Sequence, residues 1–84
     1  MDEAQKLFER MTRSKSGWKA RDLEALYLGF GFQKREGGKH VVYSHPEFPQ
    51  LRATVTRARN LPRGYVQTAL SLINELRRLK EQQP

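Results

Sequence analysis

The glycine pair Gly37-Gly38 constrains the fold of this chain more than any other feature. Glycine adopts positive φ at little steric cost, so the pair predicts a tight turn. The segments on either side, residues 30–35 and 40–44, read as strands, and the second is rich in Val and Tyr. Proline cannot donate to a strand ladder, so Pro46 ends the second strand. Together these features predict an antiparallel hairpin.

The rest of the chain adds a third strand and three helices. Apolar and polar residues alternate over 51–57, as in a half-buried strand. Apolar residues at helical spacing predict helices over 2–13, 21–28 and about 65–80, with Gly29 ending the second. The core stripe expected of the last helix is Val66, Ala69, Leu70, Ile73 and Leu76. The predicted fold class is α+β: a three-stranded antiparallel meander with helices on one face and the other face more open.

Positive charge is unevenly distributed along the chain. The 84 residues hold 16 Lys and Arg against 9 Asp and Glu, a formal net charge of +7. Residues 33–64 contain seven of the basic residues and only two Glu, so this stretch has a net charge of +5. Such an excess favours a polyanionic partner through phosphate contact and counterion release. The alternative is that the charge merely keeps a small protein soluble.

Length and residue usage limit the class of protein. The length predicts one domain, 1–84, whose core is too small for a deep cofactor cavity, so no cofactor is expected. The absence of Cys excludes disulfides, thiolate zinc sites and cysteine nucleophiles. No apolar run approaches the roughly 18 residues that span a membrane, and the start Met1-Asp2-Glu3-Ala4 lacks a signal-peptide pattern. We therefore expect a soluble, cytoplasmic protein with no membrane partner.

His40 is the leading candidate for chemistry because the turn delivers it to the start of a strand. Cleavage of RNA without a metal needs a base for the 2′-OH and an acid for the leaving 5′-oxygen, and imidazole can fill either role near neutral pH. The alternative is a surface histidine that hydrogen-bonds a backbone carbonyl. His45 follows five residues later, an odd offset that puts the two side chains on opposite sides of a regular strand. This offset argues against a joint metal site, and we expect His45 to stabilise a turn.

Basic residues around His40 are candidates for contacts with RNA phosphates. Lys39 could stabilise negative charge on a scissile phosphate, or could be a solvated turn residue. Arginine forks match phosphate bidentately, so an arginine-rich loop before a helix could hold an RNA backbone, or could simply be solvated. The candidate RNA-binding or supporting residues are Gly38, Lys39, Lys34, Arg35, Arg57, Arg59 and Arg63.

Four features, in order, resemble the HicA family, the toxin half of bacterial and archaeal toxin–antitoxin pairs. They are an amphipathic helix before Gly31-Phe32, the glycine turn Gly38-Lys39-His40, the run Tyr43-Ser44-His45-Pro46, and a strand, basic loop and closing helix over residues 54–70. The resemblance covers about residues 18–76, and its specificity comes from the order and spacing of the four features in so short a chain.

The resemblance implies a double-stranded-RNA-binding-domain-like α-β-β-β-α fold with an extra N-terminal helix, as an extension over 1–15 and a core over 18–80. It implies a ribonuclease that cleaves mRNA and is masked by a HicB-type antitoxin. His40 occupies the position of the family's catalytic histidine. Two departures concern activity. Lys39 replaces the small residue before that histidine, and a Val-Pro-x-His segment is missing where Arg57 or Arg59 could replace its phosphate contact.

Two other functions fit the same residues. One is a non-catalytic RNA-binding module, which would bind RNA with a steep salt dependence and leave it intact. The other is an interaction domain that retains only its antitoxin partner, whose acidic groups would pair with the basic face. Tyr65, Leu72 and Leu79 widen the apolar face of the last helix, which could cover the N-terminal helix or form a homodimer.

Overall fold

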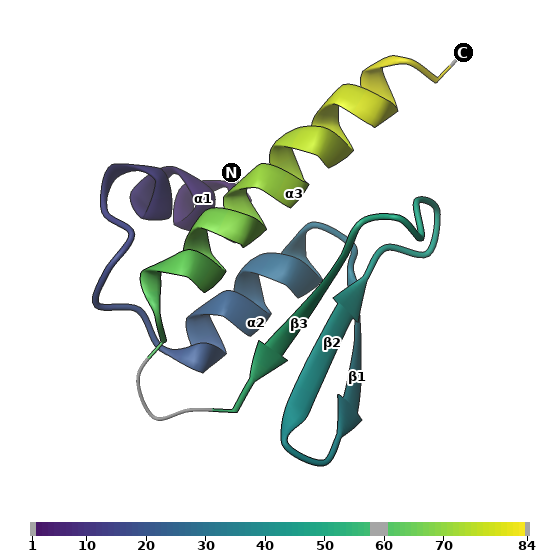
Figure 1. Cartoon of the computed structure of the whole chain (residues 1–84). Coiled ribbons are helices and arrows are strands. Elements are labelled where there is room, and N and C mark those ends of the chain that lie inside the picture. Colours follow the sequence, from purple (N-terminus) through teal and green to yellow (C-terminus); the bar gives the residue numbers. More distant parts are fainter. Residues whose placement is uncertain (1, 58–60, 84) are drawn as a thin grey trace.

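The computed structural model describes residues 2–57 and 61–83. Along them the elements follow in the predicted order, with two helices, three strands and a third helix (Figure 1). Their bounds are α1 Glu3–Arg13, α2 Ala20–Gly29, β1 Gln33–Gly37, β2 His40–Ser44, β3 Arg52–Thr56 and α3 Arg63–Glu81. The predicted α+β class is confirmed.

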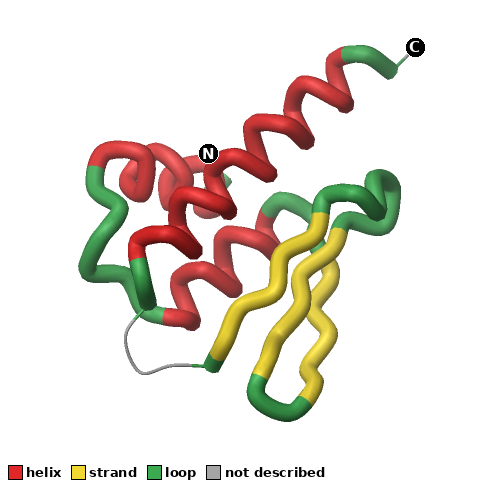
Figure 2. Tube along the Cα trace, viewed as in Figure 1, coloured by secondary structure: helices red, strands yellow, loops and turns green. Residues whose placement is uncertain are grey.

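The three strands form one antiparallel sheet in the order β1-β2-β3, so β2 lies at its centre. The helices lie on one side of this sheet, and the described part of the chain leaves the other side open (Figure 1, Figure 2). α2 packs against β1 and α3 packs against β3, whereas α1 packs against the other two helices. We call the two faces the helix side and the open side of the sheet.

Alternation along the strands decides which side chains meet the helices. Val41 and Tyr43 of β2 are buried on the helix side, and so are Ala53 and Val55 of β3. The predicted stripe of α3 is confirmed, because all five of its residues are buried. The residues that widen this stripe are half-buried against the chain's own core: Tyr65, Leu72 and Leu79. The core therefore lies between the sheet and the helices.

α3 begins at Arg63, two residues before its predicted start, and spans 19 residues. Pro62 precedes it in an extended conformation, and a proline is tolerated there because the first amides of a helix have no intrahelical partner. Among the residues that the structure describes, neither this helix nor a shorter one is long and apolar enough to cross a membrane.

The end of α2 corrects the prediction for Gly29, which is the last helical residue and not the terminator. The chain reverses two residues later at Gly31, whose φ of 89° is a conformation that favours glycine. Gly31 N–H donates to the Leu28 carbonyl and Phe32 N–H donates to the Tyr27 carbonyl, which is the hydrogen-bond pair of a Schellman motif.

The Schellman motif also shifts the start of the first strand. Phe32 packs edge-on against Tyr27 with ring centroids 5.0 Å apart, the apolar contact that accompanies this motif. Residues 30–32 are therefore occupied in closing the helix. The predicted strand start at Phe30 was wrong, and β1 runs from Gln33 to Gly37.

The hairpin turn lies one residue later than the glycine pair suggested. β1 extends through Gly37, so the two turn residues are Gly38 and Lys39. Gly38 has a φ of 52° and Lys39 has no positive φ, which is the sign pattern of a type II′ turn. Gly37 pairs directly with His40 across the turn, so His40 is the first residue of β2, as predicted.

α1 contributes to the main core. Its N-terminus is capped by Asp2, whose side chain accepts a hydrogen bond of 2.9 Å from the Ala4 N–H. Phe8 and Met11 are buried in the same cluster as residues of α2, α3 and the sheet. The guanidinium of Arg77 in α3 lies 4.6 Å from the centre of the Phe8 ring. The segment predicted as an extension is therefore packed into the fold.

Candidate functional site

His40 is exposed at the hairpin end of the open side. Its neighbours across the sheet are Gly37 of β1 and Thr56 of β3. Alternation puts Val42 and Ser44 of the same strand on the open side too, because their neighbours in β2 are buried on the helix side. A ligand that lies along the open side can therefore reach the imidazole.

Arg57 is fastened to the turn that carries His40. Its backbone N–H donates to the Lys39 carbonyl at 2.9 Å, and its Nε–H donates to the Gly38 carbonyl at 3.1 Å. Its Nη2 also lies 3.5 Å from Glu36 Oε1. Since arginine has five N–H donors, part of the guanidinium stays free for a ligand. The structure thus brings Arg57 to the turn residues Gly38 and Lys39. Its guanidinium lies with Glu36 on the helix side, whereas His40 faces the open side.

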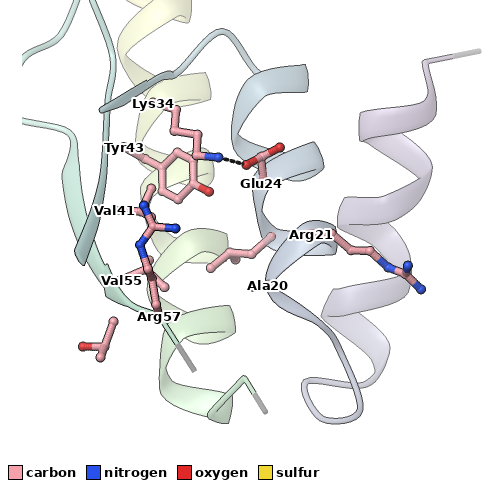
Figure 3. A pocket seen from close by; sticks show the side chains of 10 residues that line it. Ala20, Arg21, Glu24, Lys34, Val41, Tyr43, Val55 and Arg57 are labelled. Atoms are coloured by element: carbon pink, nitrogen blue, oxygen red, sulfur yellow. Dashed lines mark hydrogen bonds and ion pairs between the residues drawn. The ribbon is translucent and has the colours of Figure 1, made fainter. Parts of the chain in front are cut away.

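Lys34 faces the opposite way from His40. It pairs with Tyr43, whose side chain is buried on the helix side, and it forms ion pairs with Glu24 of α2 and, at 3.0 Å, with Glu36 (Figure 3). Hydrogen bonds to these two carboxylates raise the pKa of Lys34, and the hydrogen bond from Lys34 lowers the pKa of Glu36. The charge of Lys34 is therefore matched within the chain and ties α2 to the sheet.

A pocket of about 330 Å³ opens beside this ion pair, between α2 and the helix side of the sheet. Tyr43, Val41 and Val55 contribute its apolar lining, and Arg57 stands at its sheet edge (Figure 3). Arg21 points away from the ion pair of Lys34 (Figure 3). The pocket is at the lower end of the size range of small-molecule sites, about 300–1,000 Å³. Of its charged lining residues, Glu24 and Lys34 pair with each other, and Arg57 pairs with Glu36.

Arg35 shares the open side with His40, because it pairs with Val42 across the sheet. Arg52 stands on the same side, opposite Ser44, and was not among the predicted site residues. The strand register could have indicated Arg52, since every second residue of the third strand faces the same way. No acidic residue of the described strands faces the open side. The residues that do are Gln33, Arg35, Gly37, His40, Val42, Ser44, Arg52, Thr54 and Thr56.

The two remaining arginines of the prediction, Arg59 and Arg63, follow the third strand in the sequence. Arg63 is exposed as the first residue of α3. Arg59 lies outside the described residues. Of the predicted basic residues, the structure thus groups Lys39 and Arg57 around the turn, puts Arg35 on the open side, and turns Lys34 to the helix side.

Tyr65 links α3 to the strand position opposite His40, and the sequence did not indicate this link. Its hydroxyl donates to Thr56 Oγ1 at 3.0 Å and accepts a bond of 3.3 Å from the Thr56 N–H. These hydrogen bonds lower the pKa of Tyr65. Because Thr56 is the direct cross-strand partner of His40, α3 holds the strand end that lies beside the imidazole.

His45 has a structural role. Its side chain is 3% exposed, and its Nδ1 accepts a hydrogen bond of 3.1 Å from the Glu47 N–H. Its ring packs between Phe32 and Phe48. The predicted stabilisation of a turn is confirmed. Within the described residues, no three His, Asp or Glu side chains gather where they could hold a metal ion.

The chain was compared with models of protein families, with curated proteins and with solved structures. None of them matches it. The resemblance to HicA toxins and the catalytic role of His40 therefore stay predictions.

Proposed function

We propose that this protein is a HicA-like toxin that cleaves mRNA through His40 and is held inactive by a HicB-type antitoxin. The observation that carries this proposal is the position of His40, exposed at the hairpin end of an open sheet side that bears arginines and no acidic residue among the described strands. A polyanion meets no repulsion from these strands, and phosphate contacts there release counterions.

The proposal extends to the fold. Residues 20–81 follow the order α-β-β-β-α with both helices, α2 and α3, on one side of an antiparallel sheet, and this order supports a double-stranded-RNA-binding-domain-like arrangement. α1 is then the extra helix. A HicB-type antitoxin would cover the basic side, and its acidic groups would compete with RNA phosphates for the same arginines.

In the proposed reaction, the imidazole of His40 takes the proton of a ribose 2′-OH and the oxygen attacks the adjacent phosphorus. The bond from phosphorus to the 5′-oxygen breaks, and this oxygen takes a proton from water while the imidazolium returns its own to solvent. The products are a 2′,3′-cyclic phosphate and a 5′-hydroxyl. Lys39, next to His40 in the turn, supplies positive charge where the phosphate oxygens gain negative charge. Arg57 holds the turn from the helix side through its bond to the Gly38 carbonyl.

The deciding experiment incubates a long RNA with the wild type and with His40→Ala in the presence of a chelator. We expect the substitution to slow cleavage by about 100-fold or more, the usual contribution of general acid–base catalysis. His45→Asn is the matched control, because it removes the other histidine, keeps an acceptor for the Glu47 N–H, and should leave cleavage intact. Full activity of a folded His40→Ala protein would refute the assignment.

One observation favours a second candidate, a non-catalytic RNA-binding module. His40 has no second histidine near it, because His45 is buried away from the open side. In the same experiment this module would bind RNA and cleave none of it. The logarithm of its association constant would fall linearly with the logarithm of the salt concentration, with a slope of about −0.7 for each phosphate contacted on a single strand.

A further inference from the structure

We propose that a hollow between Arg35 and Arg52 binds a phosphate group of the RNA strand and so fixes the path of RNA towards His40. This inference rests on the proposed function, because it assigns a subsite to the same RNA. The hollow has a volume of about 190 Å³, and its lining is Arg35, Val42, Ser44, Pro49 and Arg52.

The register places the two arginines on either side of the central strand. Arg35 of β1 pairs with Val42, and Arg52 of β3 pairs with Ser44 two residues further along β2. Adjacent strands lie about 4.8 Å apart, so the outer strands are about 10 Å apart and two arginine side chains can reach one group between them. Half-buried Val42 and Ser44 form the floor, and Pro49 from the loop after β2 forms a wall.

The charges of the hollow are unmatched. Within the described residues, neither Arg35 nor Arg52 forms an ion pair or a side-chain hydrogen bond, whereas Lys34 and Arg57 are both paired with Glu36. No acidic residue lines the hollow. Two free guanidinium forks and the Ser44 hydroxyl supply the donors that a phosphate group accepts.

The size of the hollow selects the ligand. Its volume of about 190 Å³ lies below the roughly 300–1,000 Å³ of sites that enclose small organic molecules. An ionic group fits it better than a whole base or cofactor. A phosphate that belongs to a strand brings further contacts along the open side, whereas a free anion brings none.

The hollow and His40 occupy one line on the open side. Ser44 is four residues from His40 in the same strand, a separation of about 13 Å. Thr54 of β3, opposite Val42, lies between them, and Thr56 lies opposite His40. A single RNA strand can therefore place one phosphate in the hollow and another beside the imidazole, whereas a dinucleotide is too short to reach both.

The test measures binding of a fluorescent uridine oligonucleotide of about 12 nucleotides, the scale of single-strand sites. All proteins carry His40→Ala, so that cleavage does not interfere. We expect Arg35→Gln/Arg52→Gln to weaken binding by about 10-fold or more and to reduce the salt slope by about 0.7. Lys6→Gln/Arg13→Gln, which removes the same charge from exposed positions of α1, is the matched control and should bind as the parent does.

Equal affinity of the two double variants would overturn the proposal. A titration of the parent protein with inorganic phosphate, followed by NMR, distinguishes a free anion from a phosphate of RNA. If the Arg52 signals shift in this titration but Arg35→Gln/Arg52→Gln binds RNA as tightly as the parent, the hollow is a free-anion site and the proposal is overturned. The outcome is independent of cleavage. If the wild type cuts no RNA but the arginine variant binds weakly, the subsite stands and only the nuclease assignment fails. If the wild type cuts RNA and the arginine variant binds normally, the nuclease assignment stands and only the subsite fails.

Discussion

The two histidines differ in what surrounds their rings. His40 meets solvent at the hairpin, while His45 is enclosed by Phe32 and Phe48. Burial lowers the pKa of His45, the positive charge of Lys80 lowers it further, and Glu47 acts in the opposite direction. The folded protein therefore resists protonation of His45 as the pH falls.

This resistance predicts how stability depends on pH. An unfolded chain takes up a proton at His45 below about pH 6.5, and the native state does not until the pH reaches its lower folded pKa. The wild type should therefore lose stability as the pH falls below about 6.5, with a slope of at most about 1.4 kcal/mol per pH unit from this group. His45→Asn should remove this part of the slope, because asparagine keeps an acceptor for the Glu47 N–H but does not titrate.

The measurement is urea unfolding from pH 7.5 to pH 5 on the wild type, on His45→Asn and on His40→Asn, which removes the exposed histidine and serves as the control. Identical slopes for the wild type and His45→Asn would contradict the prediction. The sequence already placed the two histidines on opposite sides of a strand. It could not show the enclosure of His45, because Phe32 comes from the turn after α2 and meets the imidazole only in the folded chain.

At the scale of elements, the contact of α1 with α2 depends on a missing side chain. A Cβ at Gly29 would overlap with the Cβ of Ala4, so the two helices approach as closely as they do only because this position is glycine. Both atoms are rigid parts of their helices, and neither can rotate away. The contact therefore acts as a constraint on the spacing of α1 and α2.

We predict that Gly29→Ala destabilises the protein by about 1–2 kcal/mol. Overpacking costs about 1–3 kcal/mol, and the higher helix propensity of alanine, about 1 kcal/mol at most, offsets part of it. Thermal unfolding measures the change. Gly64→Ala is the control, since a Cβ there meets nothing within 4 Å, and it should be neutral or stabilising. If Gly29→Ala is as stable as Gly64→Ala, the helices are free to separate and the constraint does not exist.

Periodicity predicted the kind and order of all six elements, and it predicted β2 to the residue, because a turn and Pro46 bound its Val- and Tyr-rich run. Periodicity misplaced the end of α2 because either of two glycines, Gly29 or Gly31, could terminate the helix. Packing decides between them: Gly29 lies against Ala4 and stays helical, while Gly31 takes positive φ close to the ring of His45. Neither contact is visible in local sequence.

At the scale of the whole molecule, the sheet divides between its two sides basic residues that are close together in the sequence. Strand register turns Lys34 to the helix side, where α2 packs against the sheet and brings Glu24 within reach of it. Strand register places Arg52 on the open side, where it lines the same hollow as Arg35. Charge counting therefore gives only the net charge of a stretch of sequence, and the fold decides which of those charges remain free to meet a polyanion.

The resemblance to the HicA family implies that residues 1–15 are an extension of the domain, whereas the structure packs α1 into the core. Whether the rest of the chain can fold without α1 follows from the size of this contact. Phe8 and Met11 are buried there, and the Arg77 guanidinium lies 4.6 Å from the Phe8 ring centre and 5.5 Å from that of Phe30. Burial of two such side chains stabilises by about 1.5–3 kcal/mol each, or about 3–6 kcal/mol together. A chain of this length has a total stability of about 4–13 kcal/mol.

Removal of residues 1–15 should therefore lower the melting temperature by at least about 12 °C, or abolish cooperative unfolding, because a loss of 1 kcal/mol shifts it by about 4–8 °C in a domain of this size. Circular dichroism against temperature measures the change. The full-length Lys6→Gln/Arg13→Gln protein controls for charge, since both side chains are exposed on α1 and it should melt with the wild type. A truncated protein that melts at the wild-type temperature would show that α1 is a dispensable extension, and that residues 18–80 form the folding unit without Phe8 and Met11.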